Sequence, residues 1–210
     1  MYVPRHFATD GPGALRELLQ LAPLAQVVSM TDDGLVATAA PLLLVERDQS
    51  IVLQGHVSRA NDHWKRIDQS VDTLVIVSGP DAYVTPNNYP SKHLTHEVVP
   101  TWNYEAVHVR GPLTVHDDPA WLLDLVTRLT DEHERGRPDP WAVTDAPDHY
   151  IELRLRGIVG IEVAVDRIEA KAKLSQDKSV EDQAGVRAGL AAGSPGDRGV
   201  AERMADSPHT

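Results

Sequence analysis

The stretch from Ile51 to Trp64 carries the residue types best suited to hold an anion. A short apolar strand is predicted to end at Gly55, and a helix is predicted to begin at Asp62 or His63. Between them lies a polar run of His56, Ser58, Arg59 and Asn61. An arginine guanidinium can donate two hydrogen bonds to a phosphate, and a serine hydroxyl can donate one. A helix N-terminus adds free N–H groups and a positive dipole. An ordinary strand-to-helix turn with a capping Asn or Asp explains the same residues, so both interpretations stand at this point.

Two further segments, 85–92 and 101–104, add the other parts of a ligand site. They supply a second cation, hydroxyl groups and flat aromatic surfaces, from Lys92, Thr85, Ser91, Thr101, Tyr89 and Trp102. A phosphorylated aromatic cofactor needs this mixture of charge, planar walls and sparse hydrogen bonds. Because only one anion site is evident, flavin mononucleotide (FMN) fits better than a dinucleotide.

Other chemistries find little support. The chain has no cysteine, which excludes disulfides and thiolate chemistry, and it lacks a G-x-S-x-G elbow and glycine-rich phosphate loops. His93 and His96 have a three-residue spacing, but they lie in an unperiodic loop with only Glu97 nearby, so a solvated loop is favoured over a metal site. No self-contained catalytic constellation emerges.

The charge balance argues against direct DNA binding. Lys and Arg number 20 against 31 acidic residues, a net charge of −11, whereas DNA-binding proteins present a basic face. The N-terminus lacks the apolar core of a signal peptide and no apolar run approaches a membrane span, so a cytoplasmic location without membrane association is expected.

The predicted elements are mostly short strands. Strands are expected over residues 25–30, 35–46, 51–53, 73–78, 82–85, 102–111, 112–115 and 157–165. Turns are expected at 32–34 and 79–81, and Pro41 predicts an edge or a bulge. Helices are expected over residues 11–21 and 119–135, and Asp117-Asp118-Pro119 is predicted to cap and start the second of these. Residues 148–156 are ambiguous, and a short helix near 186–190 precedes a loose tail. Short strands joined by hairpins, with helices over the ends, favour a small antiparallel barrel.

Six motifs then identify a family resemblance. MYVPRHF, GHVSRANDHW, YVTPNNYPSK, VPTWNYEAVHVRG, IVGIEV and KLSQDK, in this order from Met1 to about Gly193, resemble the PaiB family of FMN-binding split-barrel proteins. The resemblance implies a mainly β fold with α-helices, a six-stranded antiparallel Greek-key split barrel with peripheral helices. It places this domain at 1–178 and a C-terminal helical extension and flexible tail at 179–210. It also implies FMN at a homodimer interface and a role as a negative transcriptional regulator.

The resemblance assigns twelve residues to the cofactor. Arg59 and Lys92 become the phosphate cations, Ser58 and Asn61 add hydrogen bonds, and Thr38 lies beside the ring. Trp102 and Asn103 approach from the dimer side. The full expected set is Thr38, His56, Ser58, Arg59, Asn61, Thr85, Lys92, Trp102, Asn103, Lys173, Ser175 and Gln176.

The chain departs from the family pattern at Ala39 and Ala172, which replace a ring-side histidine and an aromatic wall, and at Asp177, which replaces an amide. Two alternatives therefore stay open beside the regulator. One is a flavin-dependent oxidoreductase resembling pyridoxamine-phosphate oxidases or flavin reductases. The other is a split barrel that has lost its cofactor and serves as an interaction module.

Overall fold

The computed structural model describes residues 1–48 and 50–206, and these divide into two compact units. The first unit combines residues 1–21, residues 78–107 and the chain from Glu169 onward. The second unit combines residues 22–77 and 108–168. The expected boundary between residues 178 and 179 falls inside the first unit and stays a prediction.

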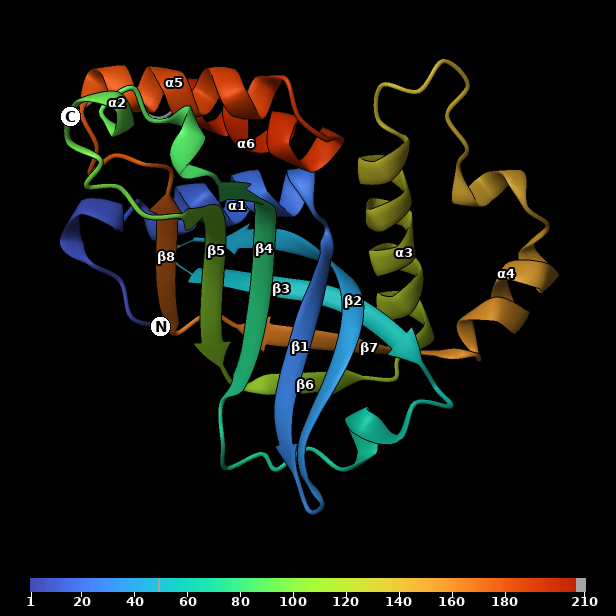
Figure 1. Cartoon of the computed structure of the whole chain (residues 1–210). Coiled ribbons are helices and arrows are strands. Elements are labelled where there is room, and N and C mark those ends of the chain that lie inside the picture. Colours follow the sequence, from blue (N-terminus) through green and yellow to red (C-terminus); the bar gives the residue numbers. More distant parts are fainter. Residues whose placement is uncertain (49, 207–210) are drawn as a thin grey trace. The chain divides into compact units, whose positions relative to one another are not determined.

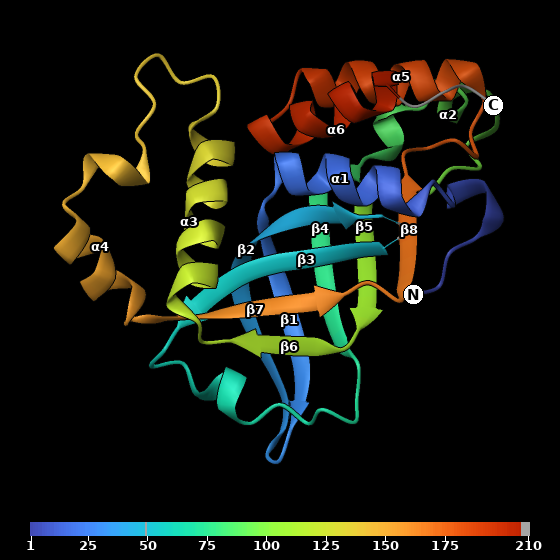
Figure 2. The same cartoon turned by 180° about the vertical axis from the view of Figure 1, so that it is seen from behind.

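The second unit is built on a curled antiparallel sheet (Figures 1 and 2). Its strands are β1 (Leu24–Thr31), β2 (Gly34–Arg47), β3 (Ser50–Ser58), β6 (Leu113–His116) and β7 (Ile158–Ala164), and β4 (Thr73–Val84) begins in it. The predicted hairpin is confirmed, because Thr31 pairs with Gly34 across the two-residue loop Asp32-Asp33.

The long strand β2 changes partners at Pro41. Residues 34–41 pair with β1, and residues 42–47 pair with β3. Of the two expectations for Pro41, an edge or a bulge, the edge is wrong because β2 lies between β1 and β3, and Pro41 instead marks the change of partner. Proline is tolerated since its missing N–H falls where one ladder ends and the next begins. A Cβ at Gly55 would lie 2.5 Å from the Pro41 carbonyl oxygen, which explains why β3 needs a glycine there.

Two helices, α3 (Pro119–Glu134) and α4 (Asp148–Leu155), contact strand β7 and each other. The 3-10 turn η4 (Val143–Asp145) lies between them in the sequence. The Asp118 carboxylate accepts from the Trp121 N–H at 2.8 Å and caps α3, as its sequence predicts. The Trp121 ring packs on β7, where a Cβ at Gly160 would lie 2.1 Å from it.

The first unit contains the remaining elements. These are η1 (Arg5–Phe7), α1 (Gly11–Leu21), the end of β4, η3 (Pro86–Asn88), α2 (Lys92–Thr95), the start of β5 (Thr101–Gly111), β8 (Arg167–Lys173), α5 (Val180–Ala191) and α6 (Pro195–Asp206). Figures 1 and 2 both show α5 and α6 side by side.

The described part of the C-terminal segment is helical where a loose tail was expected. Helix α5 is longer than predicted, and α6 was not predicted. Its residues Val200, Ala201 and Met204 are buried with Val84 and Tyr89 in one apolar cluster. This packing stabilises a helix that its Gly- and Asp-rich sequence does not favour. The last four residues of the predicted tail lie outside the described part.

The strands hydrogen-bond in the order β6-β7-β3-β2-β1-β4-β5-β8. The mainly β fold with helices is confirmed, but the expected six strands become eight. Strand β8, at one end of this order, was not expected from the sequence. The expected turn at 79–81 is also wrong, because β4 runs straight through it. At Gly79 the chain needs space rather than a turn, since a Cβ there would lie 2.8 Å from Leu18.

Candidate functional site

The twelve expected cofactor residues fall into two groups. Five belong to the second unit and lie on or beside β2 and β3, and we call them the β3 group: Thr38, His56, Ser58, Arg59 and Asn61. Seven belong to the first unit, and we call them the β8 group: Thr85, Lys92, Trp102, Asn103, Lys173, Ser175 and Gln176.

Arg59 is the best-anchored cation of the β3 group. Its Nε donates to the Arg156 carbonyl oxygen at 2.9 Å and its Nη2 donates to the Ile158 carbonyl oxygen at 3.0 Å. Both terminal nitrogens also pair with the Asp117 carboxylate. This pairing raises the pKa of Arg59 and lowers the pKa of Asp117. Arg59 lines a cavity of about 560 Å³ together with Asp117, Pro119, Leu122 and Leu155.

The helix expected after Arg59 is a single 3-10 turn, η2 (Asp62–Lys65). Asn61 caps it, since its side-chain oxygen accepts from the His63 N–H at 3.0 Å. The capping interpretation is thus confirmed, whereas the expected helix dipole is small because the turn has four residues. The expected end of the strand at Gly55 is wrong, because β3 passes through Gly55 and ends at Ser58.

A small polar network joins strand β2 to this turn. The Asn61 amide donates to the Thr38 hydroxyl at 3.1 Å, and the same hydroxyl lies 2.8 Å from His63 Nδ1. The imidazole is buried, which lowers the pKa of His63, and its Nε2 has no hydrogen-bond partner among the described residues. Sequence reasoning did not assign His63 a role, although it lies two residues from Asn61.

His56 and Ser58 lie close in sequence to Arg59 but face other surroundings. His56 lines a second, mostly apolar cavity with Trp141 and Tyr150, and burial lowers its pKa. The Ser58 hydroxyl is exposed and accepts from the Ala60 N–H at 3.3 Å. Within the β3 group, the structure therefore brings Thr38 and Asn61 together directly, while His56 and Arg59 line different cavities.

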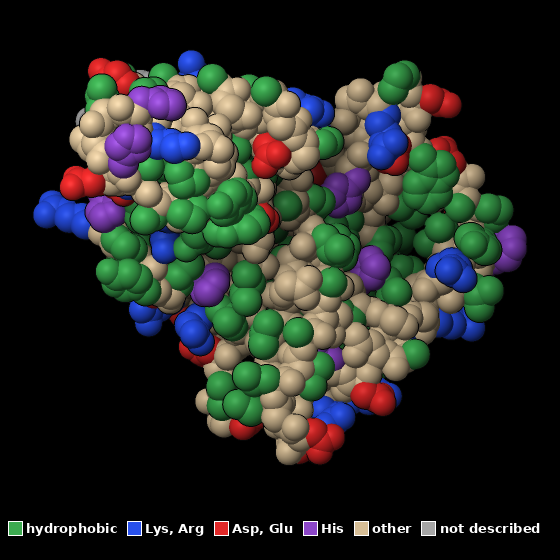
Figure 3. All heavy atoms as spheres, in the orientation of Figure 1, with side chains coloured by type: hydrophobic (Ala, Val, Ile, Leu, Met, Phe, Trp, Pro, Cys, Tyr) green, Lys and Arg blue, Asp and Glu red, His purple; other side chains and the backbone are tan. Residues whose placement is uncertain are grey.

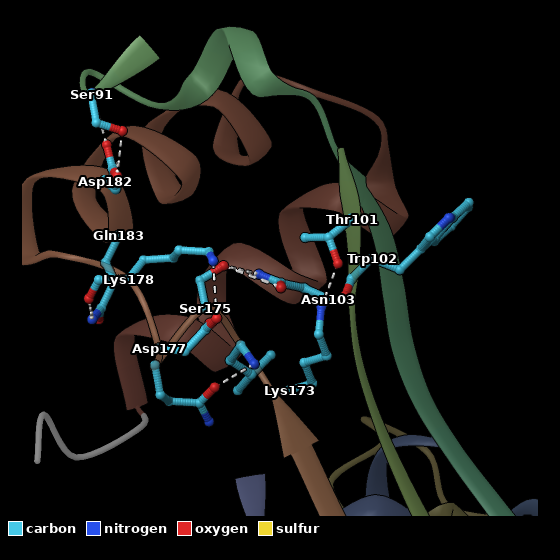
Figure 4. Close-up of polar contacts among 12 residues, drawn as sticks. Ser91, Thr101, Trp102, Asn103, Lys173, Ser175, Asp177, Lys178, Asp182 and Gln183 are labelled. Carbon is cyan, nitrogen blue, oxygen red and sulfur yellow. Dashed lines mark hydrogen bonds and ion pairs between the residues drawn. The ribbon is translucent and has the colours of Figure 1, made fainter. Parts of the chain in front are cut away.

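Lys173 is the central cation of the β8 group. Its ammonium donates to the Thr101 hydroxyl at 2.6 Å and to the Trp102 carbonyl oxygen at 2.5 Å (Figure 4). Burial is the main cause that lowers the pKa of Lys173. The Trp102 side chain points away from these contacts in Figure 4 and is 52% exposed.

Asn103 and Ser175, which are close in sequence to Trp102 and Lys173, form a buried pair. Asn103 is fully buried and its amide nitrogen lies 3.0 Å from the Ser175 hydroxyl. Ser175 has a positive φ of 68°, a conformation that is costly for a residue other than glycine. The Gln176 side chain closes the same turn, because it accepts from the Leu174 N–H at 2.6 Å and donates to the Ala172 carbonyl oxygen at 2.7 Å.

The two remaining members of the β8 group, Thr85 and Lys92, both contact Asn87 of the turn η3. Thr85 caps this turn by accepting from the Asn87 N–H at 3.3 Å. The Lys92 ammonium donates to the Asn87 side-chain oxygen at 2.5 Å. Thus the structure groups Thr85 with Lys92, and Lys173 with Asn103, Ser175 and Gln176.

Comparison with known proteins identifies the family to which this chain belongs. Residues 1–167 match a family model described as "Putative FMN-binding domain". Because this match spans most of the chain, the chain belongs to the PaiB-like FMN-binding family, as its motifs predict. Its relatives include the protease synthase and sporulation protein PAI 2 of Bacillus subtilis (strain 168), which is 30% identical over 186 residues, covering 89% of this chain and 87% of the relative.

Solved structures support the fold. The flavocytochrome Anf3 from Azotobacter vinelandii superposes with a TM-score of 0.56 at 18% identity, covering 87% of this chain and 78% of that chain. The FAD and heme binding protein from Mycobacterium smegmatis gives 0.56 at 20% identity, covering 89% and 80%. At these identities the comparison establishes a shared fold only.

Among residues 1–48 and 50–206, no group of three or more His, Asp or Glu side chains could hold a metal ion. None of the helices in the same residues is both long and apolar enough to cross a membrane.

Proposed function

We propose that the chain is an FMN-binding protein that works as a homodimer with a regulatory output. Membership of the family over residues 1–167 is the observation that carries this proposal. The Arg59 guanidinium of the β3 group suits a phosphate, because its planar set of N–H donors matches the phosphate oxygens. When bound, FMN supplies electron and hydride transfer.

Arg59 is the proposed phosphate cation of the second unit. Four of its N–H donors are engaged by two backbone carbonyl oxygens and Asp117, and arginine has five. The carbonyl contacts fix the guanidinium plane whatever its anion partner is. Asp117 is 56% exposed, so a phosphate could replace it without burying an unpaired carboxylate.

Lys92 is the proposed phosphate cation of the first unit, and Lys173 is proposed to position the segment 101–103 beside the cofactor. Among the residues that the structure describes, the Lys92 ammonium donates to Asn87 alone, so it keeps donors for an anion. The Lys173 ammonium donates hydrogen bonds to the Thr101 hydroxyl and the Trp102 carbonyl oxygen, which suits a residue that positions this segment.

FMN titration of the purified full-length protein tests these assignments. Arg59→Ala and Lys92→Ala are each expected to weaken FMN binding about 10- to 100-fold, the usual effect of losing a charged hydrogen bond. Arg187→Ala removes an exposed arginine of α5 and serves as the charge-matched control. Equal FMN affinity in the wild type and both variants would remove the phosphate assignment. If the wild-type protein does not bind FMN, the result would favour the alternative of a split barrel that has lost its cofactor and serves as an interaction module.

The dimer is proposed to use an exposed apolar face of the first unit. Tyr83 and Trp102 are 49% and 52% exposed and contact each other edge to face at 5.9 Å. Figure 3 shows hydrophobic side chains gathered over the neighbouring parts of β4 and β5. Exposed apolar clusters of this kind mark interaction surfaces. Trp102→Glu is expected to give monomers in light scattering after size exclusion, whereas Leu35→Glu, at another exposed position, keeps the dimer.

A regulatory output through direct DNA contact is not expected, because the net charge of −11 opposes phosphate binding. A sequence-specific gel shift with duplex DNA at physiological salt would contradict this. The flavocytochrome with the same fold favours the oxidoreductase as the second candidate. Rapid bleaching of the FMN-loaded protein by NADH or NADPH would support that candidate over the regulator.

A further inference from the structure

The second unit contains a cavity that Arg59, the proposed phosphate cation, does not line, and His56 is the member of the β3 group that lines it. It measures about 410 Å³ and lies between α3, α4 and the segment that joins them. Small-molecule sites commonly occupy roughly 300–1,000 Å³. Figure 3 shows the surface hollowed between α3 and α4, with hydrophobic side chains around the hollow. Its apolar lining includes Val126, Val143, Ile151 and Leu155.

Helix α4 presents apolar side chains on more than one side. Leu155 is buried, whereas Tyr150 and Leu153 are 47% and 60% exposed and also line the cavity. Trp141, from the segment before α4, lines it too and is 46% exposed. Two exposed aromatic rings at one apolar cavity are the features of a ligand site rather than of a solvated helix.

One uncompensated cation lies at this cavity. Arg47, Arg59, Arg66 and Arg128 of the same unit are each paired with a carboxylate. Arg154 has no carboxylate partner among the described residues, and its guanidinium lies 5.8 Å from the centroid of the Tyr150 ring. An arginine that stacks on an aromatic ring keeps its N–H edge available for an anion.

We propose that this cavity binds a planar aromatic monocarboxylate, whose ring packs against Trp141 and Tyr150 and whose carboxylate pairs with Arg154. The single guanidinium matches a single negative charge, and the two aromatic side chains match a flat apolar body. The site goes beyond the proposed FMN function, because Arg59 lines a different cavity.

The other polar groups of the cavity are consistent with this ligand. His56 lines it from β3, and burial lowers the pKa of His56, so its ring is neutral at pH 7 and adds no second cation. The Thr130 side chain also lines the cavity and offers a hydroxyl to a carboxylate oxygen. Neither group opposes a monoanion.

Calorimetric titration of the full-length protein with 2-naphthoate tests the proposal, with the uncharged 2-naphthamide as the matched ligand. Arg154→Gln is expected to weaken naphthoate binding about 10- to 100-fold, as for the loss of a charge-assisted hydrogen bond. The same variant should leave naphthamide binding unchanged. Arg187→Gln, which removes an exposed arginine of α5, should leave both unchanged.

Filling the cavity gives a second, independent variant. Ala146→Trp places a large side chain among the lining residues and should abolish binding of both ligands, with an unchanged unfolding midpoint as evidence that the protein folds. Naphthoate binding that is absent in the wild type at millimolar concentration, or equal in Arg154→Gln, would overturn the proposal. So would displacement of naphthoate by FMN together with its loss in Arg59→Ala, which would assign the ligand to the flavin site.

Discussion

Two ion pairs of the same chemistry lie in opposite surroundings. In the first unit, the Arg203 guanidinium donates to both oxygens of the Glu105 carboxylate, with N···O distances of 2.7 and 3.0 Å. In the second unit, the Arg59 guanidinium donates to both oxygens of Asp117. Glu105 is 6% exposed and Asp117 is 56% exposed. A buried carboxylate cannot lose its partner without a large cost, whereas an exposed one can. The first pair therefore holds its unit together, and the second is free to exchange its anion.

The largest expected difference between the two ion pairs appears when each arginine is replaced in turn. Arg203→Leu leaves Glu105 buried and unpaired, and also removes a contact with Glu17 of α1 at 2.8 Å. We expect a loss of about 3–5 kcal/mol of unfolding free energy. Arg59→Leu should cost much less, because the pair with Asp117 is exposed to solvent. Urea denaturation measures both values.

The double variant Glu105→Leu with Arg203→Leu is the control for the buried pair. Because it removes the stranded carboxylate, it should recover much of the stability that Arg203→Leu loses. Equal losses in Arg203→Leu and Arg59→Leu would show that burial does not separate the two pairs.

The second prediction extends the comparison to neutral groups. Asn103→Ala removes the fully buried partner of the Ser175 hydroxyl, and an unsatisfied buried group costs about 1–3 kcal/mol. Asn87→Ala removes an exposed asparagine at η3 and should cost far less. Equal unfolding free energies for the two variants would mean that the buried pair does not stabilise the turn at Ser175.

The sequence predicts what depends on neighbouring residues. The cap at Asp118, the strand over residues 102–111 and the hairpin at Asp32-Asp33 are all local features, and all are confirmed. The strand through Gly79 and the helix α6 depend on packing against distant segments, so local turn and composition signals gave the wrong answer.

The same limit applies to the candidate site. The motif around Arg59 identifies a cation at the end of a strand, but its partner Asp117 lies 58 residues further along the chain and looks like an ordinary helix-start acid. Likewise, the motif KLSQDK names Lys173 and Ser175 without indicating that both bond to the start of β5. The sequence motifs therefore identify these residues, whereas their hydrogen-bond partners are known only from the folded structure.

A third prediction uses the exchangeable pair to test the proposed FMN function. If phosphate replaces Asp117 on Arg59, then Asp117→Asn removes the competitor, and FMN should bind up to about fivefold more tightly. Asp62→Asn makes the same charge change at an exposed carboxylate that pairs with Lys65, and should leave FMN affinity unchanged. Weaker FMN binding in Asp117→Asn would place the phosphate elsewhere.

The smallest expected effect concerns pH and the buried imidazole of the second unit. Burial lowers the pKa of His63, so the unfolded chain takes up this proton first as the pH falls below about 6.5. The unfolded state then binds more protons, and stability declines as the pH falls. His63→Gln should reduce the slope of unfolding free energy between pH 7 and 5.5 without abolishing it, because burial lowers the pKa of His56 as well. His93→Gln, at an exposed position of α2, should leave the slope unchanged. A slope that is identical in His63→Gln and the wild type would show that this imidazole is protonated equally in both states.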